Sequence, residues 1–165
     1  RENYRKFKSR TEDLDRRITA SMQSIPTRNR KLLTYHDSFP FFAARYELSI
    51  IGAIQPSDFS EPSARDMARL IDQVRESEVP AIFGSKVFSS DVMQQIAIEA
   101  NVLFVDELRD DDLPGIPGDT DHTYLGLILA NVKAILLGLG GTIEPLIGYD
   151  PSLVFDEPST AKYPQ

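Results

Sequence analysis

The sequence predicts an α/β domain in which a four-stranded parallel sheet is covered by helices and preceded by one long helix. Three observations support this fold class. Short apolar segments alternate with amphipathic ones from residue 31 to residue 139, as in repeated β–α units with right-handed crossovers. The short segments are apolar throughout, as is typical of parallel strands that are covered on both faces. A longer amphipathic pattern, residues 2–25, comes before the first strand.

The first helix is defined by apolar residues at spacings of three, four and seven, which fall on one stripe: Tyr4, Phe7, Leu14, Ile18, Met22 and Ile25. Proline disfavours the α conformation of the residue before it, so Pro26 ends the helix. At about 1.5 Å per residue the helix spans on the order of 35 Å, enough to connect two lobes. An ordinary surface helix of a single domain would show the same pattern.

The elements that follow are read from apolar runs and from capping residues. Strands are expected at 31–35, 49–54, 79–83 and 102–105, and helices at 39–46, from a Ser60 cap to about 76, from a Ser89 or Ser90 cap to 100, and at 124–139. The last helix contains Asn131 and Lys133 and has about 16 residues, too few for a membrane span, so we expect a buried core helix and no membrane insertion. Residues 141–165 are rich in proline and read as an irregular tail.

The charge of the chain is unevenly distributed. The net charge is -7, but residues 1–31 carry ten basic and four acidic side chains, which leaves an acidic remainder. An acidic body argues against nucleic-acid binding, which needs a basic face. Cysteine is absent and only two histidines occur, so thiolate metal sites, disulfides and sites built from several imidazoles of this chain are excluded. Dinucleotide, Walker A and Gly-x-Ser-x-Gly motifs are absent from the sequence.

Candidate site residues lie where the predicted strands end, because sites in open α/β sheets form at the carboxyl ends of strands. These residues are His36 and Asp37, Gln55 and Asp58, Gly84, Ser85 and Lys86, and Asp106 and Glu107. Imidazole and carboxylate are ligands for Zn²⁺ and Mn²⁺, which makes His36 and Asp106 the candidate metal ligands. Asp37 and Glu107 would add negative potential that attracts cations.

Other acidic groups are assigned to structure rather than to metal. Residues 110–112 read as a solvated acidic turn, since they lack the glycine and the distal glutamate of a calcium loop. Residues 119–121 read as the cap of the last helix, and His122 as a surface residue in its first turn.

Four segments together resemble one protein family. Leu33–Tyr46 resembles the "His-Asp-x-Phe-x-Tyr-Phe-x-x-x-Tyr" segment of the cluster A-I (cluster 9) metal-binding proteins of bacterial ABC transporters, which deliver zinc or manganese. Glu61–Arg65 resembles the family's Glu-Pro-Ser helix start, Leu103–Asp106 its strand ending in a ligand aspartate, and Asp121–Val132 the start of its last helix.

The resemblance implies a fold of two α/β lobes joined by one long helix, with the metal between them. Residues 1–26 would then be the interlobe helix, 27–140 the C-terminal lobe and 141–165 a tail beyond the family pattern. Two histidine ligands would come from an N-terminal lobe that this chain lacks, and the other two ligands fall on His36 and Asp106. The implied partners are the metal ion, the N-terminal lobe and an ABC permease, and the implied location is the periplasm or the outer side of the cytoplasmic membrane.

The sequence departs from the family pattern at three positions. Glu47 stands where relatives usually have glycine, Gly84 near a frequent glutamate and Pro40 near a common glycine. All three are expected near the cleft. His36 favours Zn²⁺ and Asp106 favours Mn²⁺, so the choice of metal stays open.

Two other functions compete with metal binding. In an enzyme of doubly wound type, His36 would be the general base and Asp106 would orient it. In an interaction module, the basic segment 1–31 would dock onto an acidic partner. The enzyme would also need a nucleophile or a cofactor loop, which the sequence does not show.

Overall fold

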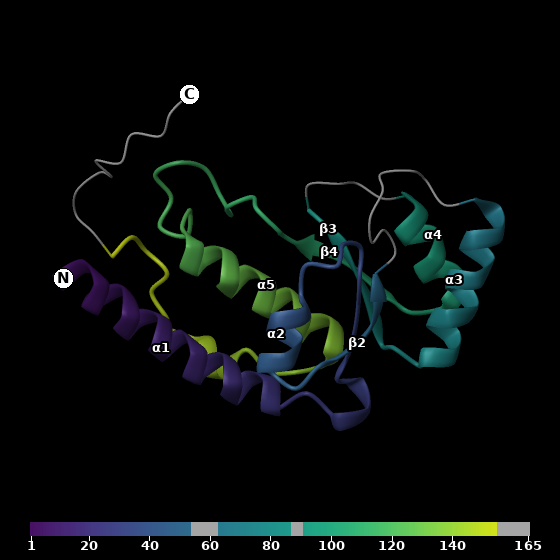
Figure 1. Ribbon diagram of the computed structural model, residues 1–165, viewed down its shortest axis with the longest axis horizontal. Coiled ribbons are helices and arrows are strands. Elements are labelled where there is room, and N and C mark those ends of the chain that lie inside the picture. Colours follow the sequence, from purple (N-terminus) through teal and green to yellow (C-terminus); the bar gives the residue numbers. More distant parts are fainter. Residues whose placement is uncertain (54–62, 87–90, 155–165) are drawn as a thin grey trace.

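The structure, a computed structural model, describes residues 1–53, 63–86 and 91–154 (Figure 1). Four parallel strands form one sheet in the spatial order β2-β1-β3-β4. The strands are β1 (Lys31–Thr34), β2 (Ser49–Ala53), β3 (Ala81–Ser85) and β4 (Leu103–Leu108). The α-helices of the described residues are α1 (Glu2–Gln23), α2 (Pro40–Arg45), α3 (Ala64–Ser77), α4 (Asp91–Ala100) and α5 (Tyr124–Leu139). The predicted fold class is confirmed.

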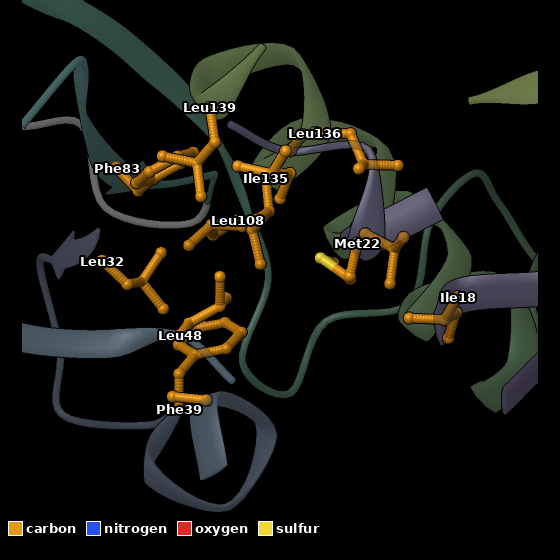
Figure 2. Packing of buried hydrophobic residues seen from close by; sticks show 14 of the residues in the cluster. Ile18, Met22, Leu32, Phe39, Leu48, Phe83, Leu108, Ile135, Leu136 and Leu139 are labelled. Carbon is orange, nitrogen blue, oxygen red and sulfur yellow. The ribbon is translucent and has the colours of Figure 1, made fainter. Parts of the chain in front are cut away.

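The sheet lies between two layers of helices (Figure 1). Successive strand residues point to opposite faces, so Ile82 of β3 packs with α3 and α4 whereas Phe83 packs with α1 and α5. Figure 2 shows Met22 of α1 across the second of these clusters from Leu32 of β1, with Leu108 of β4 between them. Strands β1, β3 and β4 are therefore all anchored in the hydrophobic core.

The stripe of α1 is buried only in its C-terminal half. Leu14, Ile18 and Met22 are 1–2% exposed, whereas Tyr4 is 68% exposed. Phe7 is half-buried, and its ring centroid lies 6.4 Å from that of Tyr124. The amphipathic pattern thus extends about two turns beyond the part of the helix that the core covers.

Several predicted boundaries and caps are wrong. β3 begins at Ala81 rather than at residue 79, and β4 continues to Leu108 rather than ending at residue 105. The Ser63 hydroxyl caps α3 by accepting a hydrogen bond from the Asp66 amide at 3.3 Å. Thr123, not residues 119–121, caps α5, because its hydroxyl accepts from the Gly126 amide at 2.9 Å. The predicted caps Ser60, Ser89 and Ser90 lie outside the described residues.

Residues after α5 return along α1 (Figure 1). They include a short 3₁₀ turn, η2 (Glu144–Leu146), in which Leu146 is only 3% exposed and joins the core around α1 and α5. In the described ranges no helix combines the length and the apolar character needed to cross a membrane.

Candidate metal centre

His36 lies directly after β1, at the edge of the sheet where the parallel strands have their carboxyl ends. The buried Thr34 hydroxyl donates a hydrogen bond to the His36 carbonyl at 2.7 Å. The Tyr35 amide donates to the Phe83 carbonyl of β3 at 2.9 Å. The Tyr35 and His36 rings pack edge to face with centroids 4.5 Å apart. These contacts fix the backbone that carries the partly buried His36 imidazole.

Asp106 lies inside β4, at a point where the register between β3 and β4 shifts. Residues 83–85 of β3 pair with residues 105–108 of β4, so Asp106 and Glu107 both lie opposite Gly84. Such an irregularity bends a strand and re-aims its side chains. The prediction that Asp106 and Glu107 follow the strand is therefore wrong, because the strand resumes after the extra residue. Gly84 and Ser85, both predicted to follow β3, likewise lie inside the strand, and only Lys86 follows it.

The carboxylate of Asp106 is incompletely satisfied. Its Oδ1 atom is buried and has no hydrogen-bond partner in the described part of the chain. Burial raises the pKa of Asp106 above its usual 3.8, Lys86 opposes this shift and Glu107 adds to it. A buried polar atom without a partner is costly unless a ligand satisfies it. A divalent cation is a ligand of that kind, since carboxylate oxygens bind both Zn²⁺ and Mn²⁺.

Charges next to Asp106 differ from those expected. The Lys86 ammonium lies 3.1 Å from Oε1 of Glu107. This exposed ion pair offsets part of the charge of Glu107, which still raises the pKa of Asp106, so the attractive potential of Glu107 stays a prediction. Asp37 is exposed beside His36 and remains a candidate for that role. Gln55 and Asp58 lie outside the described residues.

His36 and Asp106 share one edge of the sheet but not one strand pair. β3 lies between β1 and β4, and with strands about 4.8 Å apart, positions on β1 and β4 are separated by about 10 Å. Two side chains can span that distance to one ion. The described residues contain no group of three or more His, Asp or Glu side chains that could hold a metal. The assignment of His36 and Asp106 as metal ligands therefore stays a prediction.

The end of β4 is fixed by a residue of α5. Asn131, only 5% exposed, accepts a hydrogen bond from the Arg109 amide at 2.8 Å and donates one to the Arg109 carbonyl at 2.7 Å. This reciprocal pair holds the chain three residues after Asp106. The sequence signal for this contact is Asn131 itself, an amide side chain in a helix whose residues are mostly apolar.

The remaining acidic and imidazole groups organise the loop before α5. Arg109 pairs with Asp112, and Oδ2 of Asp119 accepts from the Ile116 amide at 2.9 Å. Nδ1 of His122 lies 3.0 Å from the Pro114 carbonyl oxygen. His122 precedes α5 and is partly buried, so its predicted place as a surface residue in the first helical turn is wrong.

One departure from the family pattern is not near the site. Glu47 has φ of 58° and pairs with Arg30 at 3.4 Å. Arg30 and Glu47 precede β1 and β2, so they lie at the amino edge of the sheet, opposite His36. Pro40 occupies the first turn of α2, where its missing amide hydrogen costs nothing.

Residues 1–137 match the family model described as zinc-uptake complex component A, periplasmic, or ZnuA. The chain belongs to the ZnuA family. The predicted resemblance to the cluster A-I metal-binding proteins is thereby confirmed.

Two curated relatives and one solved structure are similar to this chain. The zinc-binding protein TroA of Treponema pallidum is 28% identical over 142 residues, 84% of this chain and 46% of TroA. The manganese-binding lipoprotein MntA of Bacillus subtilis is 25% identical over 143 residues, 84% of this chain and 47% of MntA. The solved structure of periplasmic TroA superposes with a TM-score of 0.71 and 27% identity over 82% of this chain and 50% of that structure. The chain spans about half the length of these relatives.

Proposed function

We propose that this chain is the C-terminal lobe and linking helix of an extracytoplasmic solute-binding protein that captures Zn²⁺ or Mn²⁺ for import by an ABC permease. The observation that carries the proposal is Oδ1 of Asp106, which is buried and has no hydrogen-bond partner among the described residues, at the sheet edge that also carries His36. Membership in the ZnuA family and the names of its relatives, zinc-binding TroA and manganese-binding MntA, support it.

The ligand set divides between two lobes in this proposal. His36 supplies one ring nitrogen and Asp106 one or two oxygens, and two further histidines come from an N-terminal lobe. The pair alone then binds metal weakly, because half of the coordination sphere is left to water. One imidazole and one carboxylate suit both Zn²⁺ and Mn²⁺, so the N-terminal ligands decide the selectivity.

The structure favours this function over catalysis by His36. Within the described residues, β3 separates the strand end that carries His36 from the strand that carries Asp106, and Gly84 of β3 contributes no side chain. A general base needs its orienting carboxylate within hydrogen-bond reach. This arrangement argues against a catalytic His36–Asp106 pair and supports a binding protein.

Docking through the basic segment 1–31 also loses support. The cations of α1 are largely paired with acidic residues of the same helix: Lys6 with Glu2, Lys8 with Glu12, and both Arg16 and Arg17 with Asp13. The basic face thus carries a network of exposed ion pairs. The segment still has ten basic and four acidic side chains, but no observation beyond this net charge points to an acidic partner.

Competition with a chromogenic Zn²⁺ chelator tests the proposal on this chain. We expect His36→Ala and Asp106→Asn each to weaken Zn²⁺ binding at least tenfold. The matched controls are His122→Gln, the only other histidine, and Asp111→Asn in the exposed acidic turn, and neither should change the affinity. Binding that is unaffected by His36→Ala and Asp106→Asn would contradict the proposal.

A further inference from the structure

The segment that follows α5 is bound along α1 by side chains of both partners. Residues 138–154 lie beyond the part of the chain that the ZnuA family model matches. Their contacts with α1 are therefore not required by the family pattern, and they are separate from the candidate metal centre.

Arg17 of α1 makes the central contacts. Its Nη1 donates to the carbonyls of Pro145 at 3.0 Å and Ile147 at 3.2 Å. Its Nε pairs with Oδ2 of Asp13 at 2.9 Å, which orients the guanidinium toward the segment. The guanidinium carbon also lies 5.9 Å from the centre of the Tyr149 ring. One arginine thus binds two carbonyls and packs on an aromatic ring.

Arg10, two turns earlier, repeats this arrangement. Its Nη1 donates to the carbonyls of Asp150 at 3.2 Å and Ser152 at 2.9 Å, and its Nη2 lies 3.1 Å from Oδ2 of Asp150. In return, the Tyr149 hydroxyl donates to the Arg10 carbonyl at 3.2 Å. The Tyr149 side chain is half-buried, and burial is the main reason that its pKa is raised.

The two ends of the segment are fixed as well. The Thr142 amide donates to the Ser24 hydroxyl, just beyond the C-terminal end of α1, at 2.7 Å. The Thr123 hydroxyl, which caps α5, donates to the Pro151 carbonyl at 2.6 Å. The segment therefore follows α1 from Ser24 to Arg10, about 21 Å at 1.5 Å per residue, and then joins the start of α5.

We propose that residues 142–152 form a strap that holds α1 against the lobe, through Arg17 in its C-terminal half and Arg10 in its N-terminal half. In the described structure no residue of α1 before Leu14 is buried, so apolar packing alone gives this half little support. A helix with few tertiary contacts opens readily. The strap supplies further contacts, because its backbone carbonyls accept hydrogen bonds from Arg10 and Arg17 and its Tyr149 hydroxyl donates one to the Arg10 carbonyl. It thereby fixes the direction in which α1 leaves the lobe.

The consequence for metal capture rests on the proposed function. If α1 links two lobes, a strap that fixes its direction also fixes where the other lobe stands relative to His36 and Asp106. The local effect on α1 is independent of that step, so the strap can be tested without metal.

Amide hydrogen exchange of the 165-residue chain, followed by mass spectrometry without metal, tests the strap. We expect the double variant Arg10→Ala/Arg17→Ala to exchange about tenfold faster than wild type in residues 5–13, with α3 and β3 unchanged. Alanine is the strongest helix former, so faster exchange would not follow from helix propensity. Unchanged exchange in residues 5–13 would overturn the proposal.

Arg16→Ala is the matched control. Arg16 pairs with Asp13 at 2.8 Å, as Arg17 also pairs with Asp13, but no hydrogen bond joins Arg16 to residues 140–154, the described part of the segment after α5. We expect no acceleration, and equal acceleration in this control would also overturn the strap. Tyr149→Phe serves if the double variant fails to fold, since it removes only the bond to the Arg10 carbonyl. It should accelerate exchange about threefold, and no acceleration would count against the strap.

Discussion

Gly84 lies so close to Asp106 that a Cβ atom at residue 84 would be 2.8 Å from Oδ1 of Asp106. The same Cβ would also lie 2.8 Å from the ring of Phe104. The space beside the carboxylate therefore exists because residue 84 has no side chain, and the extra residue in β4 turns Asp106 toward it. A glycine at residue 84 is therefore required by the packing of this structure.

Gly84→Ala should destabilise the protein by about 1–3 kcal/mol, because the added methyl group overpacks a site between two strands. Urea denaturation measures the loss. Gly52→Ala is the matched control: it is also a strand glycine, but its nearest neighbour is the end of the flexible Gln73 side chain at 3.3 Å. An equal loss in both variants would show that residue 84 has no special constraint.

Asp106→Asn should stabilise the metal-free protein at neutral pH. The pKa of Asp106 is raised in the folded state, chiefly by burial. The stability that the protonated Asp106 contributes to the folded protein is therefore fully present below the usual pKa of 3.8. It is lost as the pH rises through the pKa of the folded state. Asparagine has no such loss. The melting temperature of Asp106→Asn with chelator should exceed that of wild type at pH 7, and the difference should vanish below about pH 3.5.

Asp66→Asn is the control for this prediction, because the Ser63 hydroxyl lowers the pKa of Asp66. The sign reverses: Asp66 contributes stability above the usual pKa and loses it as the pH falls through the folded-state value. This variant should gain nothing at pH 7. A lower melting temperature of Asp106→Asn at pH 7 would contradict our account of the buried carboxylate.

Tyr46→Phe should reduce the free energy of unfolding by about 1.5–3 kcal/mol, the usual contribution of a hydrogen bond to a charged group. The Tyr46 hydroxyl donates to Oδ1 of Asp15 at 2.9 Å and so joins the end of α2 to α1. Burial first and this bond second raise the pKa of Tyr46 well above its usual 10. Tyr4→Phe, on an exposed side chain, should have no effect on chemical denaturation. Equal stability of wild type and Tyr46→Phe would show that the bond adds nothing.

Glu47→Gly should stabilise the protein by about 0.5–1 kcal/mol. A left-handed residue with a side chain costs roughly 1–2 kcal/mol, and the greater freedom of glycine in the unfolded chain offsets part of the gain. The Arg30 contact that is lost is weak, because the Glu47 side chain is 82% exposed. Glu47→Ala keeps the strain and loses the contact, so it should not stabilise. If Glu47→Ala stabilised the protein and Glu47→Gly did not, the left-handed backbone of Glu47 would not be the source of strain.

The sequence predicted the order of the strands and helices well because each carries an apolar pattern of the right period. The helix at residues 124–139, α5, is predicted correctly, because the segment is apolar over its whole length apart from Asn131 and Lys133. The end of β4 was missed because Asp106 and Glu107 are polar and a register shift leaves no periodic signal. His36 and Asp106 were selected as strand-end residues, but the Glu107–Lys86 pair depends on which strands are neighbours. The contacts of Arg10 and Arg17 join residues more than 120 positions apart, and local patterns do not report such contacts.

Paramagnetic Mn²⁺ tests the central claim, that His36 and Asp106 bind one metal ion, most directly. In proton–nitrogen correlation spectra of this chain, substoichiometric Mn²⁺ should first broaden the amides of residues 35–37, 84–86 and 105–107. The double variant His36→Ala/Asp106→Asn should lose this broadening. Broadening that starts instead at the acidic turn, residues 110–112, or that persists around residue 106 in the double variant, would contradict the claim.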